Sequence, residues 1–338
     1  MGKEQKSDSI YRGYLMEVLG DIDFDKIARD YDHRDISDHI EKFDENLEEV
    51  FDYIENGSVI NGDPLPWQKT WDLWRARPSE LTIWAGVNGN GKSTAQSMVA
   101  AYFNGKSVIA SLEMPTKTTK AKIFKQVAGM GNPSLEYVKA MAEELKDKIY
   151  LYNKVGRVTP DTVRGLIVYS AERLKVQHVF VDSLVKCGMG VDDYNKQKNF
   201  VSELAELAKE YKIHIHLVVH MRKGKDEFAQ PDKFDIKGAG EITDLADNVL
   251  IVNRNVKKQM RLDEMLSQGN SEEIEELKGQ PDGTIRVAKN RHGEFDGKFN
   301  FWYHPASNQW LESKNSPPLQ YEWSNQTACE PPDETFGF

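Results

Sequence analysis

The sequence predicts an α/β protein whose mainly parallel sheet is covered by helices on both faces. Short apolar runs alternate with stretches of helical periodicity from residue 81 onward, and a glycine-rich motif follows the first of these runs. The 338 residues include only two cysteines, Cys187 and Cys329. A disulfide-stabilised scaffold and a zinc finger made of cysteines alone are therefore excluded.

The predicted strands and helices alternate through the centre of the chain. Strands are predicted at Leu81–Ala85, Ser107–Leu112, Ile149–Tyr152, His178–Val181, Ile213–Val219, Asn248–Val252 and Thr284–Ala288. Helices are predicted near Thr94–Phe103, Thr116–Val127, Ser134–Leu145, Pro160–Leu174 and Lys196–Lys212. Strands separated by helices are typical of parallel sheets. A charged insertion at 255–281 is expected to be helical at Arg261–Leu266 and Glu272–Leu277.

Three segments are expected along the chain: an acidic helical part at 1–60, a large domain at 61–312 and an acidic tail at 313–338. Apolar residues recur at helical spacing near the end of the first segment, which predicts a helix at Ser37–Ile54. The tail is rich in proline and polar residues, so it is expected to be disordered. Three tryptophans at helical spacing are interpreted as core, namely Trp67, Trp71 and Trp74.

The net charge of −10 is concentrated at the two ends of the chain. Residues 1–58 carry −10 and residues 312–338 carry −4, so the part between them carries +4. An acidic chain would ordinarily argue against a nucleic-acid partner, but here the central domain has to be considered separately. There is no apolar stretch of about 20 residues and no apolar segment near Met1, so we expect neither membrane insertion nor secretion, and a reducing, cytoplasmic location.

A phosphate-binding loop is predicted at 86–93, which reads G-V-N-G-N-G-K-S and matches G-x-x-x-x-G-K-[ST]. A predicted strand precedes it and a predicted helix follows it, as the motif requires. Lys92 is expected to reach the β- and γ-phosphates of ATP, or of another NTP or dNTP, and Ser93 to bind Mg²⁺. The residues expected to bind the nucleotide are Gly86, Gly89, Asn90, Gly91, Lys92, Ser93 and Thr94.

Two acidic residues follow other predicted strands. Asp182 ends the strand that begins at His178, and the carboxyl ends of parallel strands meet at one edge, so Asp182 is expected to help hold Mg²⁺. Glu113 comes directly after the strand that follows the phosphate-binding loop. It is the best-placed residue to orient or deprotonate water for hydrolysis.

Several of these residues resemble a known family. Ser111-Leu112-Glu113-Met114 resembles the corresponding run in DnaB-type replicative helicases, which have a RecA fold. The stretch Val179–Asn255 is more similar still to the helicase domain of phage primase-helicases and Twinkle. It contains, in the same order, an Asp-ended strand, a long helix, a strand ending in His, a basic loop and a Gly-x-Gly segment. The resemblance covers roughly residues 64–312.

The resemblance implies a RecA-like core and an ATP-dependent DNA helicase of a phage-like replisome. Such an enzyme forms a ring, expected to be a hexamer although the sequence does not distinguish six subunits from seven. It moves 5′ to 3′ on single-stranded DNA. His220 would sense the γ-phosphate, while Lys289 and Arg291 would reach the neighbouring subunit's γ-phosphate, with Arg291 as the arginine finger. The residues implied to bind DNA are Arg222, Lys223, Lys225, Lys237, Gly238 and Gly240.

The chain departs from the family at several points. A primase domain is not visible, and the N-terminal segment is shorter than the helical domain of bacterial members, so a helix at Ser37–Ile54 that docks on a neighbouring subunit is our hypothesis for ring stability. Asp244 stands where members commonly carry Gln, and we assign it no phosphate-sensing role because a carboxylate cannot donate a hydrogen bond. The ending Asp333–Phe338 resembles tails that dock on replisome proteins such as a polymerase or primase, but a solvated tail is equally consistent.

Two other functions are consistent with the same motifs. One is a DNA-dependent ATPase like RecA, RadA or KaiC, which strand-exchange and fork-unwinding assays would distinguish from a helicase. The other is a nucleotide-gated helicase loader or assembly factor that binds DNA without unwinding it. The presence of both Glu113 and Arg291 favours a working motor over a loader.

Overall fold

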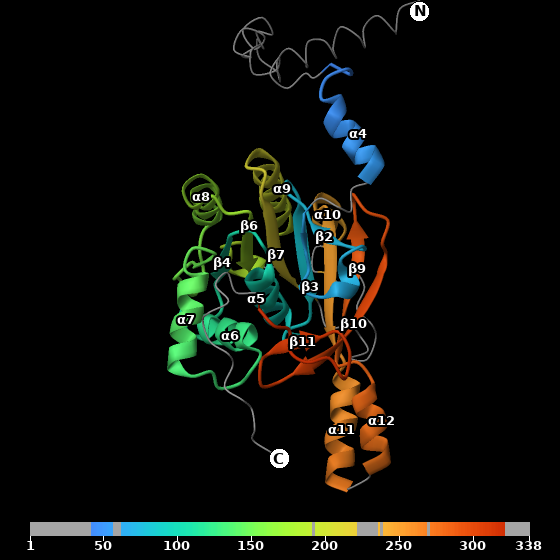
Figure 1. Ribbon diagram of the computed structural model, residues 1–338. Helices are drawn as coiled ribbons and strands as arrows, with labels where there is room; N and C mark the ends of the chain where they lie inside the picture. The colour runs from blue at the N-terminus through green and yellow to red at the C-terminus, as the bar shows by residue number, and fades with distance from the viewer. Residues whose placement is uncertain are drawn as a thin grey trace, which may run out of the picture. The chain divides into compact units, whose positions relative to one another are not determined.

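The computed structural model describes residues 42–56, 62–190, 193–221, 236, 239–268 and 271–321. The chain divides into two compact units, with the boundary between Glu55 and Asn56. The central sheet, its covering helices and a protruding helical hairpin all belong to the second unit (Figure 1).

The described part of the first unit contains the helix α4 (Leu47–Asn56). The start predicted at Ser37 lies outside the described residues, but residues 42–46 form turns rather than helix, so this part of the prediction is wrong. Asn46 has a φ of 54°, a left-handed conformation that a helix interior does not contain. The helix therefore begins after Asn46.

The second unit is built on a nine-stranded sheet with the order β11-β10-β9-β8-β3-β7-β6-β4-β5. Its strands are β3 (Leu81–Gly86), β4 (Ser107–Ser111), β5 (Ile149–Leu151), β6 (His178–Asp182), β7 (His214–His220), β8 (Asn248–Arg254), β9 (Gly283–Asn290), β10 (Gly297–His304) and β11 (Gln309–Leu311). Pairing is parallel from β5 to β8 and antiparallel from β8 to β11. All seven predicted strands are confirmed, with ends shifted by one or two residues. A short ribbon of β1 (Asp63–Pro64) and β2 (Arg75–Ala76) was not predicted.

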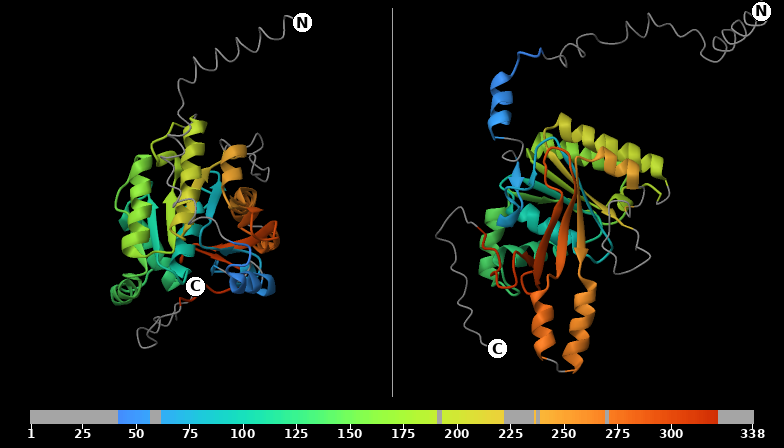
Figure 2. Two further views of the ribbon diagram at one scale, coloured as in Figure 1. Left: turned by 90° about the horizontal axis from the view of Figure 1, so that it is seen from above. Right: turned by 90° about the vertical axis from the view of Figure 1, so that its right-hand side faces the viewer.

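Helices cover both faces of this sheet, as the alternation of strands and helices predicted (Figure 1, Figure 2). The helices of one layer are α5 (Lys92–Tyr102), α6 (Thr116–Ala128) and α7 (Leu135–Leu145), and those of the other are α8 (Pro160–Tyr169), α9 (Tyr194–Glu210) and α10 (Ala239–Leu245). In β3, Trp84 packs with the first layer, whereas Ile83 and Ala85 pack with the second. Alternate residues of a strand face opposite sides, so both faces are apolar.

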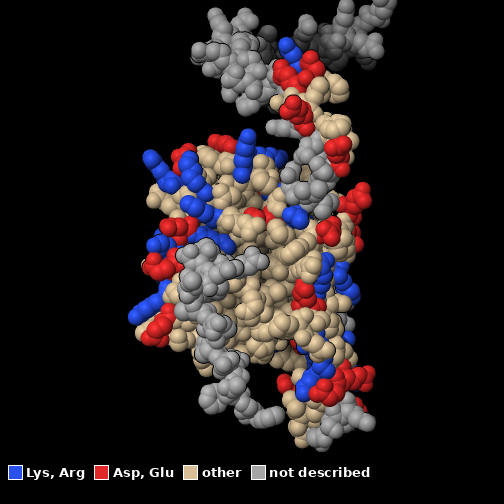
Figure 3. All heavy atoms as spheres, viewed as in Figure 1, with Lys and Arg blue, Asp and Glu red and all other residues tan. Residues whose placement is uncertain are grey.

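A helical hairpin separates β8 from β9. It consists of α11 (Val256–Gln268) and α12 (Ser271–Gly279), so both helices predicted in this insertion are present and longer than expected. Figure 1 shows the hairpin extending away from the sheet, and Figure 3 shows acidic side chains gathered over it and over α4. The hairpin therefore enlarges the surface without adding to the sheet.

The tryptophan prediction is correct for two of three residues. Trp67 and Trp74 have no exposed surface, whereas 41% of Trp71 is exposed. The three do not lie on one long helix, because only Gln68–Thr70 forms a short 3-10 turn there. The Trp67 indole donates a hydrogen bond to the carbonyl of Trp310, which fixes the start of this unit to its last strand. In the described ranges, no helix is long and apolar enough to cross a bilayer.

Three buried histidines form a cluster at the amino ends of β6 and β7. His178 bonds to Asp63 at 2.7 Å and to His216 at 3.3 Å, and His214 bonds to the Thr82 hydroxyl at 2.8 Å. Burial lowers the pKa of all three histidines, and that of His214 to about 3. All three are therefore neutral members of the core.

We predict that acid destabilises the protein through this cluster. An unfolded histidine binds a proton below pH 6.5, whereas His214 stays neutral in the folded state down to about pH 3. Its contribution should be fully present above pH 6.5 and decline below it, by about 2 kcal/mol at pH 5. Urea unfolding between pH 7.5 and 5 would measure this. His214→Gln should flatten the slope, and the exposed control His292→Asn should not; equal slopes in all three proteins would contradict the prediction.

Candidate active site

The predicted phosphate-binding loop connects β3 to α5, in the context that its motif requires. Gly89 and Gly91 have φ values of 84° and 85°, a conformation that other residues rarely adopt. A Cβ atom on Gly91 would lie 2.8 Å from the Trp310 ring, and one on Gly86 would lie 2.5 Å from the Val252 carbonyl. These glycines therefore allow the loop to approach β8 and β11 closely.

Lys92 lies inside the loop at the start of α5. Its ammonium donates hydrogen bonds to the carbonyls of Gly86 at 2.9 Å and Val87 at 3.0 Å, and only 5% of the residue is exposed. Burial lowers the pKa of Lys92, although the nearby carboxylates of Asp182 and Glu113 oppose that effect. The amino end of α5 and this cation together form an anion-binding position.

Ser93 and Asp182 meet as predicted. The Ser93 hydroxyl donates a hydrogen bond of 2.5 Å to Asp182 Oδ2, and only 4% of Asp182 is exposed. Burial, together with the charge of Glu113, raises the pKa of Asp182, while the Ser93 bond and the charge of Lys92 partly offset this. A cation would stabilise this buried carboxylate, and both donors are the oxygen ligands that Mg²⁺ prefers. The two residues therefore fit a Mg²⁺ site.

Such a cation would not be held by protein side chains alone. Among the residues that the structure describes, no group of three or more His, Cys, Asp or Glu side chains could hold a metal ion. The remaining oxygen ligands would have to come from the nucleotide and from water, as is usual for Mg²⁺ at phosphate sites.

Glu113 and His220 are brought together by Ser183, which no sequence motif marks. The Ser183 hydroxyl donates to Glu113 Oε1 at 2.9 Å and lies 3.1 Å from His220 Nε2, which is itself 3.4 Å from Glu113 Oε1. Burial alone would raise the pKa of Glu113, but the bonds from Ser183 and His220 and the charge of Lys186 outweigh it and lower the pKa. Glu113 is therefore held as a carboxylate.

The His220 ring completes this group. Burial and the charge of Lys92 lower its pKa, although Glu113 opposes them, so the ring is neutral near pH 7. Its Nδ1 atom is buried and has no hydrogen-bond partner within the described residues. Because the Nε2 hydrogen is donated to Glu113, the neutral ring leaves Nδ1 as an acceptor, which can take a hydrogen bond from a water molecule.

Lys122 is a further cation near the loop, and the sequence did not indicate it. Lys122 of α6 lies 3.5 Å from the Thr94 hydroxyl, and Gln126 of the same helix donates to the Thr94 carbonyl at 2.9 Å. Burial lowers the pKa of Lys122, and the charge of Asp182 opposes this. No local motif marks Lys122, because it reaches the loop only through the packing of α6 on α5.

A cavity of about 680 Å³ adjoins the phosphate-binding loop. Loop residues and Thr94 form one wall, and Arg254, Lys258, Tyr303 and Trp310 are among the residues that form the others. It lies between the base of the α11–α12 hairpin and the last strands of the sheet. Its size and its mixed aromatic and cationic lining fit the base and ribose of a nucleotide.

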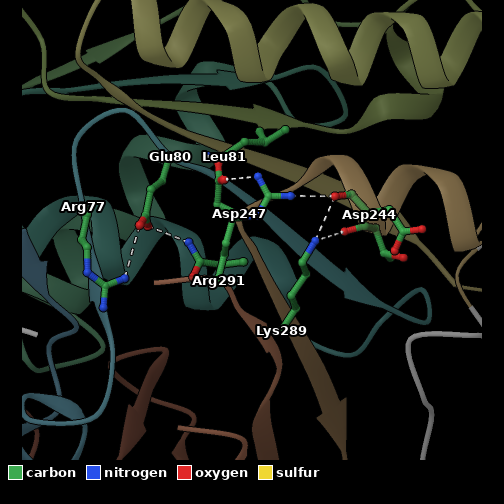
Figure 4. A network of polar contacts seen from close by, with 9 residues as sticks. Arg77, Glu80, Leu81, Asp244, Asp247, Lys289 and Arg291 are labelled. Atoms are coloured by element: carbon green, nitrogen blue, oxygen red, sulfur yellow. Dashed lines mark hydrogen bonds and ion pairs between the residues drawn. The ribbon is translucent and has the colours of Figure 1, made fainter. Parts of the chain in front are cut away.

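Lys289 and Arg291 lie at the end of β9, away from the loop of their own chain. Lys289 donates to the carbonyls of Thr243 at 3.0 Å and Asp244 at 2.9 Å, at the carboxyl end of α10 (Figure 4). Arg291 donates to the Asp244 carbonyl at 2.8 Å and pairs with the Asp247 carboxylate at 2.9 Å. Lys289 and Arg291 are thus neighbours, and Asp244 contacts both of them through its main-chain carbonyl.

The segments expected to bind DNA are only partly described. Gly240 lies in the first turn of α10, whereas Arg222, Lys223, Lys225, Lys237 and Gly238 lie outside the described residues. Met221, directly after His220, forms an antiparallel bridge with Ile236, and both are buried. The bridge therefore joins the residue that precedes the first of these segments to the residue that precedes the second.

One comparison with known proteins identifies a family, and two others support the fold. A family model described as the DnaB-like helicase C terminal domain matches residues 75–311, which is more than half of the chain. A solved structure described as an ATPase domain aligns with a TM-score of 0.64 at 15% identity, over 80% of this chain and 99% of its own. A second solved structure is described as "The Structure Of A DnaB-Like Replicative Helicase And Its Interactions With Primase". It aligns with a TM-score of 0.63 at 15% identity, over 91% of this chain and 76% of its own. At these identities the two structures support the fold alone. A search of curated proteins found no match.

The Ser183 contact generates a prediction. Ser183→Ala removes the hydrogen bond that helps to lower the pKa of Glu113, so this pKa should rise toward its ordinary value. The acid limb of the pH–rate profile for nucleotide hydrolysis should then shift to higher pH, while kcat at neutral pH should change little because Glu113 is still ionised there. Ser202→Ala, which removes a hydroxyl bonded to Glu206, is the control and should match the parent protein. An unshifted acid limb in Ser183→Ala would refute the role of Ser183.

Proposed function

The chain belongs to the DnaB-like helicases through its C-terminal helicase domain, and from this premise we propose that it is an ATP-dependent replicative DNA helicase that acts as a ring at a phage-like replication fork. The observation that supports this best is the convergence of Lys92, Ser93, Asp182, Glu113 and His220 at one edge of the sheet. These residues meet the needs of nucleoside triphosphate hydrolysis: a phosphate cradle, a cation site and an ionised carboxylate.

The proposed hydrolysis assigns one role to each of these groups, and Lys92 exchanges its bonds to the Gly86 and Val87 carbonyls for bonds to the phosphates. The loop amides and Lys92 bind the phosphates, and the cavity beside the loop receives the base and ribose. Glu113 orients and deprotonates the attacking water, while Ser183 and His220 keep it ionised. Ser93 and Asp182 would hold Mg²⁺, which supplies positive charge to the phosphate oxygens. The presence of both Glu113 and Arg291 favours a motor over a loader, for which ATP turnover stimulated by single strands without strand separation would be the sign.

We propose that the ring shares each ATP between two subunits. Lys289 and Arg291 do not contact the phosphate-binding loop of their own chain, because both bond to the end of α10. The Arg291 side chain is 39% exposed, so a neighbouring subunit can reach it. In a ring they would act on the γ-phosphate held by the next subunit, where a guanidinium stabilises the charge that develops in the transition state.

DNA binding is assigned by the family resemblance and by the position of the segments in the chain. We propose that Arg222, Lys223 and Lys225 in one segment and Lys237, Gly238 and Gly240 in the other contact the phosphates of one DNA strand, without reading sequence. Only Met221 separates Arg222, the first residue of this segment, from His220, so the proposed γ-phosphate sensor is close in the chain to the proposed DNA contacts. Translocation 5′ to 3′ on that strand, and docking of the C-terminal tail on a polymerase or primase, are parts of the same proposal.

We predict that two variants separate nucleotide binding from turnover. Lys92→Ala should abolish ATP hydrolysis and forked-DNA unwinding in a folded protein, because the phosphates lose their cation. Arg291→Ala should keep nucleotide affinity but lose about 10³-fold or more in kcat, as removal of an arginine finger does.

Fluorescent-nucleotide titration and DNA-stimulated hydrolysis would measure both effects, with the surface variant Lys146→Ala as control. Normal DNA-stimulated turnover in Arg291→Ala would contradict shared sites. Strand exchange by the parent protein without any fork unwinding would indicate a recombinase-like ATPase instead.

We also predict that α4 stabilises the ring. Leu47, Val50, Phe51 and Ile54 form one stripe of the helix, and each is at least 48% exposed. An apolar stripe of this kind is typical of a surface that packs against another chain. Leu47→Glu with Phe51→Glu should reduce the oligomer mass measured by light scattering with nucleotide, whereas Glu48→Lys, a charge change at a neighbouring position, should not. An unchanged mass after deletion of residues 1–58 would exclude this role.

A further inference from the structure

Asp247 is a buried carboxylate that joins two parts of the proposed mechanism. It lies between α10 and β8, and only 2% of it is exposed. Its Oδ2 accepts a hydrogen bond from the main-chain amide of Leu81 at 2.9 Å, and its Oδ1 pairs with the Arg291 guanidinium at 2.9 Å. Figure 4 shows the contact between this carboxylate and the Arg291 guanidinium.

A main-chain hydrogen bond reinforces each of these contacts. The amide of Asp247 donates to the Leu81 carbonyl at 3.0 Å, and the amide of Arg291 donates to the Asp247 carbonyl at 2.9 Å. Leu81 is the first residue of β3, the strand that leads into the phosphate-binding loop. The position of Arg291 is therefore tied to the strand that carries this subunit's own loop.

The Arg291 guanidinium is held at two points. One terminal nitrogen bonds to Asp247, and the other bonds to the Asp244 carbonyl at the end of α10. A planar guanidinium bonded through both terminal nitrogens has a fixed direction, which a lysine could not match. About two fifths of its side chain remains exposed, so the group is both oriented and accessible.

We propose that Asp247 is a positioning residue that orients Arg291 toward the triphosphate bound by the neighbouring subunit. The inference rests on the proposed function, because it requires Arg291 to act on a phosphate in another chain. Catalysis by charge stabilisation depends on donors that are oriented before the reaction. The carboxylate provides that orientation, whereas an amide in its place could satisfy Leu81 but could not pair with a cation.

The test compares Asp247→Asn with the parent protein. The amide oxygen can still accept from Leu81, so the fold is expected to survive, and thermal unfolding would verify this. We expect unchanged nucleotide affinity and oligomer mass, with DNA-stimulated kcat about 10- to 100-fold lower, the loss that follows when a hydrogen bond between charged groups is removed. Asp247→Glu keeps the charge and should recover part of kcat.

Two comparisons separate positioning from a structural role. Glu80→Gln is the matched control, because Glu80 is a buried acid in the same network that pairs with Arg77 and bonds to Asn248 rather than to Arg291. It should leave kcat unchanged. In an Arg291→Ala background, Asp247→Asn should have no further effect on kcat, since the group that it positions is already absent.

The outcomes distinguish this inference from the proposed function. If Arg291→Ala loses turnover but Asp247→Asn does not, the positioning role is wrong while the shared site stands. If Asp247→Asn lowers kcat equally with and without Arg291, its role is structural and the inference is overturned. If Asp247→Asn does not fold, kcat of Asp247→Glu is compared with and without Arg291. A loss that requires Arg291 supports positioning, and an equal loss in both backgrounds overturns it. Normal turnover in Arg291→Ala would refute the proposed function itself.

Discussion

The structure depends on the parallel pairing of β4, β6, β7 and β3. The main-chain ladders set Ser111 opposite Asp182 and Gly86 opposite His220, so that the carboxyl ends of four strands align at one edge. The strands stay in this register because both of their faces are buried and apolar, and a shift by one residue would exchange those faces. The proposed cation site at Ser93 and Asp182, the position of the Glu113 carboxylate and that of the predicted phosphate-binding loop are consequences of that alignment.

Much of the fold and part of the candidate site could be predicted from the sequence, because they follow from local pattern and strand order. Glu113 and Asp182 were identified because each directly follows an apolar run, and the rule for parallel strands places such residues at one edge. The family match confirms the kind of protein, and the branch closest to phage primase-helicases stays a prediction.

Other features depend on tertiary contacts that no local pattern records. Ser183, Lys122 and Asp247 contact partners that are at least 28 residues away in the sequence. The buried histidines had the sequence pattern of an ordinary strand, and their linkage to Asp63 required a ribbon that was not predicted. The start of α4 was misplaced because apolar spacing continued through Asn46, where the backbone turns.

The attachment of the α11–α12 hairpin has a consequence for how this domain can diversify. The chain leaves β8 and enters β9 at nearly the same point: the amide of Asn255 bonds to the Asp282 carbonyl at 2.8 Å, and Lys258 ties Gln280 and Asp282 to α11. The pairing of β8 with β9 therefore does not depend on the length of the segment that connects them. Segments of different length can be exchanged here during evolution, and a fluorescent module could be grafted between the two helices without changing the strand register beneath it.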